Sequence, residues 1–168
     1  MRYLLLFALF VAIGLQAQSY FSESNFKELG PMQFRWEHRN DRIHFEVISP
    51  DDGWLLLGLN QQEDIVGSSL FVGGRRDNQQ YFDERYVTGV GENSSFAEMG
   101  WSSSAKDVST RTTEDGRELL RFSLPIKSTA EHEYDLSPGQ SVWFILAYSV
   151  SDDLDHHSRF RQHIQLRL

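Results

Sequence analysis

The sequence predicts an all-β fold: an antiparallel, immunoglobulin-like β-sandwich that forms a single domain. Three observations support this class. Apolar and polar residues alternate along several short segments, turn-forming residues recur between these segments, and residues 18–168 contain no sustained helical periodicity with capping residues. About nine such segments at turn-punctuated spacing are typical of a sandwich. The chain has 168 residues, which suffices for one domain with its own hydrophobic core.

The first two expected strands form a hairpin. Residues 33–38 (QFRWEH) and 43–47 (IHFEV) each alternate between apolar and polar side chains, and Asn40-Asp41 between them is a turn-forming pair. The next segment, residues 54–59 (WLLLGL), is apolar on both faces and is therefore expected to be a central strand. Turn residues Ser49 to Gly53 separate it from the hairpin.

The remaining strands are expected further along the chain, in the order 68–73, 81–88, 109–113, 119–126, 141–150 and a last alternating segment within RQHIQLRL (161–168). Glu114-Asp115-Gly116 is a strong hairpin signal between two of them. Residues 89–100 are expected to be a long loop and residues 127–139 a polar connection. Because Trp36, Trp54 and Trp143 lie in expected strands, we expect them in the core.

The first 17 residues, MRYLLLFALFVAIGLQA, are typical of a secretory signal peptide. Arg2 gives the charged start, Leu4 to Leu15 the apolar centre, and Ala17 the small residue before the cleavage point. The alternative is a membrane anchor, but the apolar run is short beside the ~20 residues that a span needs. We therefore expect a mature domain of residues 18–168 that is secreted or periplasmic and has no membrane span.

Composition and motifs exclude several functions. The formal net charge of −8 repels phosphate backbones and argues against nucleic-acid binding. The absence of cysteine rules out disulfides, thiol catalysis, zinc–cysteine sites and cysteine-held iron–sulfur clusters. In an exported protein it fits a bacterial periplasm or secreted fraction better than a eukaryotic exterior. No G-x-S-x-G, H-E-x-x-H, P-loop or G-x-G-x-x-G motif occurs. We expect a binding module rather than an enzyme.

The order of several motifs resembles the DOMON family, named from the N-terminal domain of dopamine β-monooxygenase and related to the cytochrome domains of cellobiose dehydrogenase. The motifs that carry the resemblance are, in chain order, GWLLLGLN (53–60), VGSSLFVG (66–73), YVTGVG (86–91), LRFSLPI (120–126), VWFILAY (142–148) and HSR (157–159). Together they cover most of residues 35–168. The resemblance implies a β-sandwich that binds b-type haem in some members and sugars or other ligands in others.

In the haem-binding relatives a Met near the VGSSLFVG-like strand and a His in the penultimate loop ligate the iron, which suits electron transfer to a redox partner protein. The resemblance assigns the histidine to His157. The Met position holds Ile65, which cannot coordinate iron, and Met99 is a substitute by side-chain chemistry alone. Arg75 could contact a haem propionate. Trp101, at a loop edge, could contact a bound ligand, either haem or a sugar.

Other interpretations of these residues stay open. His157 could be a surface histidine bonded to neighbouring aspartates, and Arg75 could lie in a solvated turn. Asp152, Asp153 and Asp155 could bind Ca²⁺ or form a solvated acidic turn, the more common arrangement without EF-hand spacing. The alternative to a haem protein is a haem-free carbohydrate-binding or protein-interaction module.

Overall fold

Eleven β-strands make up most of the described chain. The computed structural model describes residues 21, 25–77, 79–127, 130, 132, 134–154 and 156–168, so the expected signal peptide lies outside the described residues. The strands are β1 (Phe26–Leu29), β2 (Met32–Arg39), β3 (Arg42–Ile48), β4 (Leu55–Asn60), β5 (Ser69–Arg76), β6 (Gln79–Gly89), β7 (Glu92–Ser95), β8 (Lys106–Thr112), β9 (Glu118–Pro125), β10 (Ser141–Tyr148) and β11 (Phe160–Arg167). Within this part of the chain, no helix has the length and apolar character that a membrane crossing requires.

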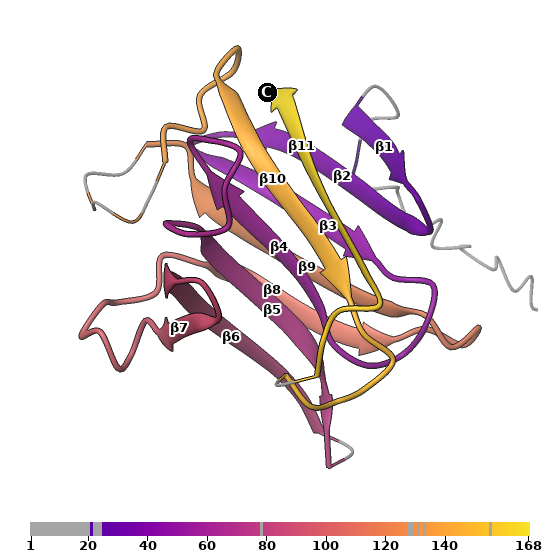
Figure 1. Cartoon of the computed structure of the whole chain (residues 1–168). Helices are drawn as coiled ribbons and strands as arrows, with labels where there is room; N and C mark the ends of the chain where they lie inside the picture. The colour runs from indigo at the N-terminus through magenta and orange to yellow at the C-terminus, as the bar shows by residue number, and fades with distance from the viewer. Residues whose placement is uncertain are drawn as a thin grey trace, which may run out of the picture.

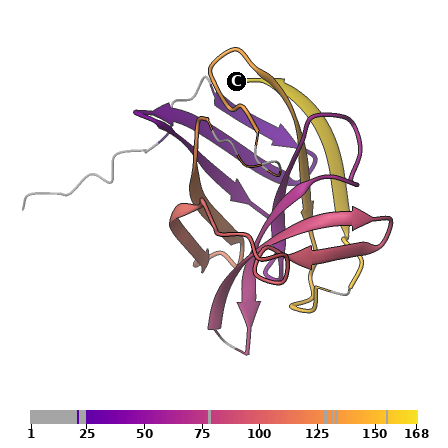
Figure 2. The same cartoon turned by 90° about the vertical axis from the view of Figure 1, so that its left-hand side faces the viewer.

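The strands form two antiparallel sheets that pack face to face. The five-stranded sheet has the order β1-β2-β3-β9-β8, and the six-stranded sheet has the order β11-β10-β4-β5-β6-β7. Figure 1 shows the six-stranded sheet in front of the other, and Figure 2 shows the same layers after a quarter turn. The expected all-β sandwich is confirmed, and the apolar segment WLLLGL contributes β4, in the interior of its sheet.

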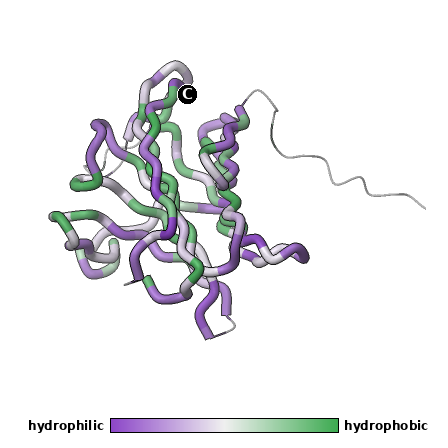
Figure 3. The backbone as a smooth tube through the Cα atoms, turned by 45° about the vertical axis from the view of Figure 1, so that its right-hand side comes forward, coloured by the Kyte–Doolittle hydropathy of each residue, from purple (hydrophilic) through white to green (hydrophobic). Residues whose placement is uncertain are grey.

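Large aromatic side chains fill the space between the sheets. Alternation along each strand turns every second residue inward, and hydrophobic and hydrophilic positions accordingly interleave along the backbone in Figure 3. Phe34 and Phe45 from the five-stranded sheet and Phe144 from the six-stranded sheet have no exposed surface. Phe71 and Phe122 stack at 4.7 Å between ring centroids and so join the two sheets. Such pairs add to the burial that stabilises the core.

Two stretches differ from expectation: the expected 89–100 loop contains a strand, and the expected polar connection contains buried side chains. Strand β7 lies inside the expected 89–100 loop, where Gly91 takes a positive φ of 77° in the turn between β6 and β7. This left-handed conformation suits glycine and closes the hairpin. In the connection from β9 to β10, His132, Tyr134 and Leu136 are buried rather than solvated. The connection therefore covers part of the core.

Two of the three tryptophans expected in the core, Trp54 and Trp143, instead lie on the outer face of the six-stranded sheet. Trp36 and Trp54 are each 5% exposed, although Trp54 faces away from the inter-sheet core. Trp143 is only partly buried, because its neighbours Val142 and Phe144 are the residues of β10 that point inward. The expectation that Trp143 lies in the core is wrong: its strand is as expected, but its side chain is on the outer face.

Candidate functional site

The outer face of the six-stranded sheet carries a second apolar cluster. Its buried members come from four strands or their ends, and partly buried side chains from the surrounding loops pack against them. The buried residues are Trp54, Leu70, Val72, Val87 and Ala147, and the partly buried ones are Leu56, Ile65, Val66, Tyr81 and Leu154. Because these five side chains are buried although they lie outside the inter-sheet core, the surrounding loops must shield most of this face from water.

A groove of about 520 Å³ lies over this cluster, within the size range of small-molecule sites. We call it the outer groove. Its floor is apolar, one wall is the polar β6–β7 hairpin, and one end is formed by the β10–β11 loop. The floor consists of Trp54, Leu56, Leu70 and Val72, and Leu154 forms the end. The wall consists of Arg85, Thr88, Gly91, Glu92, Asn93 and Ser94.

Two loops pack against the apolar cluster from different strand ends. The β10–β11 loop is tied to the floor because the indole Nε1 of Trp54 donates to the carbonyl of Asp153 at 3.0 Å. The β4–β5 loop is closed by Asn60, whose amide donates to the carbonyls of Asp64 and Val66 at 2.7 and 3.1 Å. These bonds bring Leu154 and Ile65 onto the same sheet face.

His157 and Ile65 belong to these two loops. His157 is exposed and follows Leu154 by three residues, and its imidazole has no hydrogen bond or ion pair to any residue that the structure describes. Ile65 is partly buried against the apolar cluster. Both loops therefore border the apolar cluster, whereas two polar residues of the groove wall, Arg85 and Asn93, lie outside the motifs that carry the family resemblance.

The other candidate residues lie elsewhere. Arg75 is at the end of β5, within 3.5 Å of Asp52, and does not line the outer groove. Met99 lies in the turn after β7, where its backbone N–H donates to the carbonyl of Ser95. Asp155 lies outside the described residues, and among the described ones no three acidic or imidazole side chains gather as a metal site would need.

Trp101 belongs to an aromatic cluster on the core side. Its indole stacks on the imidazole of His132, with ring centroids 4.0 Å apart and planes 6° apart. Tyr86 and Phe96 meet Trp101 edge-on at 5.1 and 5.4 Å. Because its neighbours cover so much of the ring, Trp101 is a poor stacking platform for a sugar. Sequence reasoning missed His132, a single histidine within a polar stretch.

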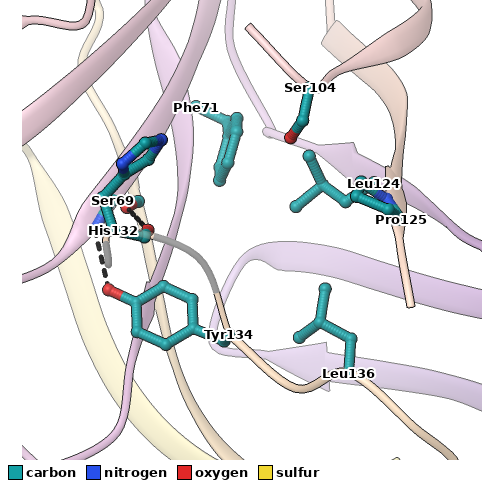
Figure 4. A pocket seen from close by; sticks show the side chains of 8 residues that line it. All are labelled: Ser69, Phe71, Ser104, Leu124, Pro125, His132, Tyr134 and Leu136. Carbon is teal, nitrogen blue, oxygen red and sulfur yellow. Dashed lines mark hydrogen bonds between the residues drawn. The ribbon is translucent and has the colours of Figure 1, made fainter. Parts of the chain in front are cut away.

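A small internal cavity adjoins His132 and is shown in Figure 4. Ser69 organises its rim: the hydroxyl donates to the carbonyl of His132 at 2.6 Å, and the backbone N–H donates to the Tyr134 hydroxyl at 3.3 Å. Tyr134 in turn donates to the carbonyl of Gly67 at 2.9 Å. The room inside, about 10 Å³, matches a single water molecule rather than a ligand. The β9–β10 connection is thereby fastened to the start of β5.

Burial shifts the pKa of one histidine and one tyrosine on the outer face in the direction that favours the neutral form. Burial, followed by the charge of Arg161, lowers the pKa of His163, which lies opposite Ile145 on the outer face. Burial also raises the pKa of Tyr81 to about 12, so its hydroxyl stays protonated at neutral pH. Neither residue lines the outer groove.

The residues that line the outer groove do not fit Met/His ligation of a haem, and the nearest candidate ligand, His157, lies in the loop at its end rather than in its lining. The apolar floor suits a flat porphyrin face, and the loop that ends the groove carries His157, whose imidazole is exposed. Ile65 has no donor atom, and none of the described residues that line the groove is a methionine or histidine. The partner ligand expected from the haem-binding relatives is therefore missing from the groove.

Comparison with known proteins agrees with this architecture. No family model matches the chain. The chain is 29% identical over 178 residues to DBH-like monooxygenase protein 2 of Mus musculus, a match that covers 95% of this chain and 27% of that protein. The chain thus spans about a quarter of the length of this relative.

Two solved structures share the fold. The cytochrome b domain of pyranose dehydrogenase from Coprinopsis cinerea aligns with a TM-score of 0.59 and 11% identity, covering 88% of this chain and 80% of that chain. The cytochrome domain of Myriococcum thermophilum cellobiose dehydrogenase aligns with a TM-score of 0.51 and 11% identity, covering 82% of this chain and 74% of that chain. With the motif order of the sequence and the two-sheet topology, these likenesses show that the chain has a DOMON-type fold.

Proposed function

We propose that this protein is an exported ligand-binding module, not an enzyme, and that the outer groove is its binding site. The observation that carries the proposal is the groove itself. It combines about 520 Å³ of space, an apolar floor, a polar wall and an end formed by the His157 loop. Sites for small molecules are typically concave and mostly apolar, with a few polar groups that fix orientation.

The leading ligand is b-type haem. Two considerations support it: the proteins of similar fold include cytochrome domains, and a histidine lies in the loop that forms one end of a groove with an apolar floor. Haem would supply a one-electron redox change, and the chain would serve a separate redox partner protein. The chain's own residues would shield the ring from water and offer the His157 imidazole. Because Ile65 replaces the expected methionine, the ligation would be by a single histidine.

An absorption spectrum tests this proposal. Protein expressed with ample haem should purify red with a Soret band, and His157→Ala should abolish or shift that band without unfolding the protein. His156→Ala is the matched control, since His156 is the adjacent residue, is also exposed, and should leave the band unchanged. Wild-type protein that takes up no haem would defeat the haem proposal.

A carbohydrate is the second candidate, and the polar wall favours it. Thr88, Asn93 and Ser94 offer hydroxyl and amide groups opposite an apolar floor. Sugars present hydroxyl edges and apolar faces, so such a groove could accommodate them. Calorimetric titration of the colourless protein with soluble oligosaccharides would test this alternative. Asn93→Ala should then weaken binding, and His157→Ala should not.

We also infer export to the periplasm or the exterior. The basis is the segment from Arg2 to Ala17, which has the pattern of a signal peptide. Mass spectrometry of the mature protein should find Gln18 as the first residue, in its cyclised form or not. A mature protein that retains Met1 and sediments with membranes would contradict this.

A further inference from the structure

Arg85 occupies the border between the apolar floor and the polar wall of the outer groove. It lies on β6 directly opposite Leu70 of β5, so its side chain projects from the same sheet face as the floor. The side chain is 26% exposed. A flat ligand that covers Leu70 would bring one of its edges to this guanidinium.

Neighbouring side chains fix the position of this guanidinium on two sides. Its Nη1 donates to the Oδ2 of Asp83 at 2.7 Å, and its Nε donates to the Oδ1 of Asn93 on β7. The Nη2 group donates to no residue in the described parts of the chain. An arginine that is held in place and keeps unused N–H groups beside a groove is preorganised for an oxygen acceptor, because little side-chain freedom remains to be lost on binding.

We propose that Arg85 binds a carboxylate on the edge of the ligand, and that the outer groove therefore selects flat, apolar molecules with an acidic edge. This rests on the proposed function of the groove. A carboxylate gains more from a guanidinium than an uncharged oxygen acceptor does, because the hydrogen bonds are charge-assisted and can be bidentate. Glu92, another charged residue of the wall, is exposed near the hairpin turn, where water and salt screen its charge.

Asp83 allows a second test of the proposal, because its carboxylate competes with the ligand for the Arg85 guanidinium. Removing the Arg85 charge should weaken binding of an acidic ligand, whereas neutralising Asp83 should strengthen it. A charge-assisted hydrogen bond corresponds to about tenfold or more in affinity. A partly exposed arginine already paired with Asp83 should contribute at the lower end, so we expect a change of about tenfold or somewhat less in each direction.

The test uses a matched pair of fluorescent probes: metal-free protoporphyrin IX, which has two carboxylates, and its dimethyl ester, which has none. Without iron, the axial ligand plays no part. Arg85→Gln should weaken binding of the diacid and Asp83→Asn should strengthen it, while the diester should respond to neither. Arg111→Gln on β8 is the charge control, because Arg111 is exposed and lies on the other sheet.

The outcomes separate the two proposals. Diacid binding that responds in opposite directions to the two variants supports the role of Arg85. If both probes bind equally well, or if Arg111→Gln weakens the diacid as much as Arg85→Gln does, the inference about Arg85 is overturned while the groove remains a binding site. If neither probe binds to the wild type, the porphyrin-binding function fails, and the inference fails with it.

Discussion

Trp143 and Phe144 are neighbours on β10 that point to opposite faces of the six-stranded sheet, so their truncation to alanine tests the assignment of the two faces. Phe144 is fully buried and its ring lies 5.2 Å from that of Phe34 and 6.0 Å from that of Phe45. Trp143 is partly buried on the outer face. Backbone, strand and sheet are the same for both, and only the surroundings of the side chain differ.

The expected costs differ because only one truncation leaves a cavity. Phe144→Ala removes a large ring from a dry core and should cost about 3–5 kcal/mol, the transfer and cavity terms together. Trp143→Ala loses only the burial of part of one ring, and water can fill the space that is left. Full burial of a large apolar side chain contributes about 1.5–3 kcal/mol, so about 1–2 kcal/mol is expected for Trp143.

Urea titrations followed by far-ultraviolet circular dichroism would measure both costs, because that signal does not depend on the tryptophan being removed. The slopes of the two transitions should agree within error, so that midpoints report stability. Phe144→Ala should have the lower midpoint by a wide margin. If Trp143→Ala is as destabilising as Phe144→Ala, the inner and outer faces of β10 have been assigned incorrectly.

Three further variants test other parts of the structure. Ile65→Met restores a thioether, and in haem-loaded protein it should change the Soret spectrum and raise the reduction potential, whereas an unchanged spectrum would place Ile65 away from the ligand. Burial raises the pKa of Glu118, so the ionised form favours unfolding and stability should fall as pH rises through the folded-state pKa. Glu118→Gln should flatten this decline, which begins near the ordinary glutamate pKa of 4.5, and parallel stability curves would show that Glu118 does not cause it. Gly53→Ala places a Cβ against the Ser149 carbonyl at a φ of +116°, and should lower the free energy of unfolding by more than ~2 kcal/mol in calorimetry. This loss should be about twice that of Gly91→Ala, whose Cβ meets nothing within 4 Å.

The sequence predicts the strands well where one face is buried and the other solvated. Residues 33–38 alternate cleanly, and the structure gives β2 with its apolar side chains turned inward. Strand β10 is different: VWFILAY is apolar at every position, so its pattern locates a strand but cannot say which residues face the core. Apolar character alone therefore cannot predict that Trp143 faces outward.

Polar strands and single functional side chains cannot be predicted from the sequence for a different reason. Strand β7 has the sequence ENSS, which lacks any apolar alternation, and it forms because the turn at Gly91 returns the chain alongside β6. Arg85 lies on an expected strand just before the YVTGVG motif and outside it, so only the fold reveals that it borders a groove. By contrast, the loops of Ile65 and His157 could be identified from residues that recur in a known order.

Trp54 serves two structures at once, the floor of the outer groove and the anchor of the β10–β11 loop. A ligand packed on this indole would therefore also oppose opening of the loop, since binding to the closed form stabilises it by mass action. The amide of Ser149, which donates to the Trp54 carbonyl at 2.9 Å, should exchange its hydrogen for deuterium more slowly in the complex. Thermodynamic reciprocity then requires that a partner protein that stabilises the closed loop also increases the affinity of the groove for its ligand.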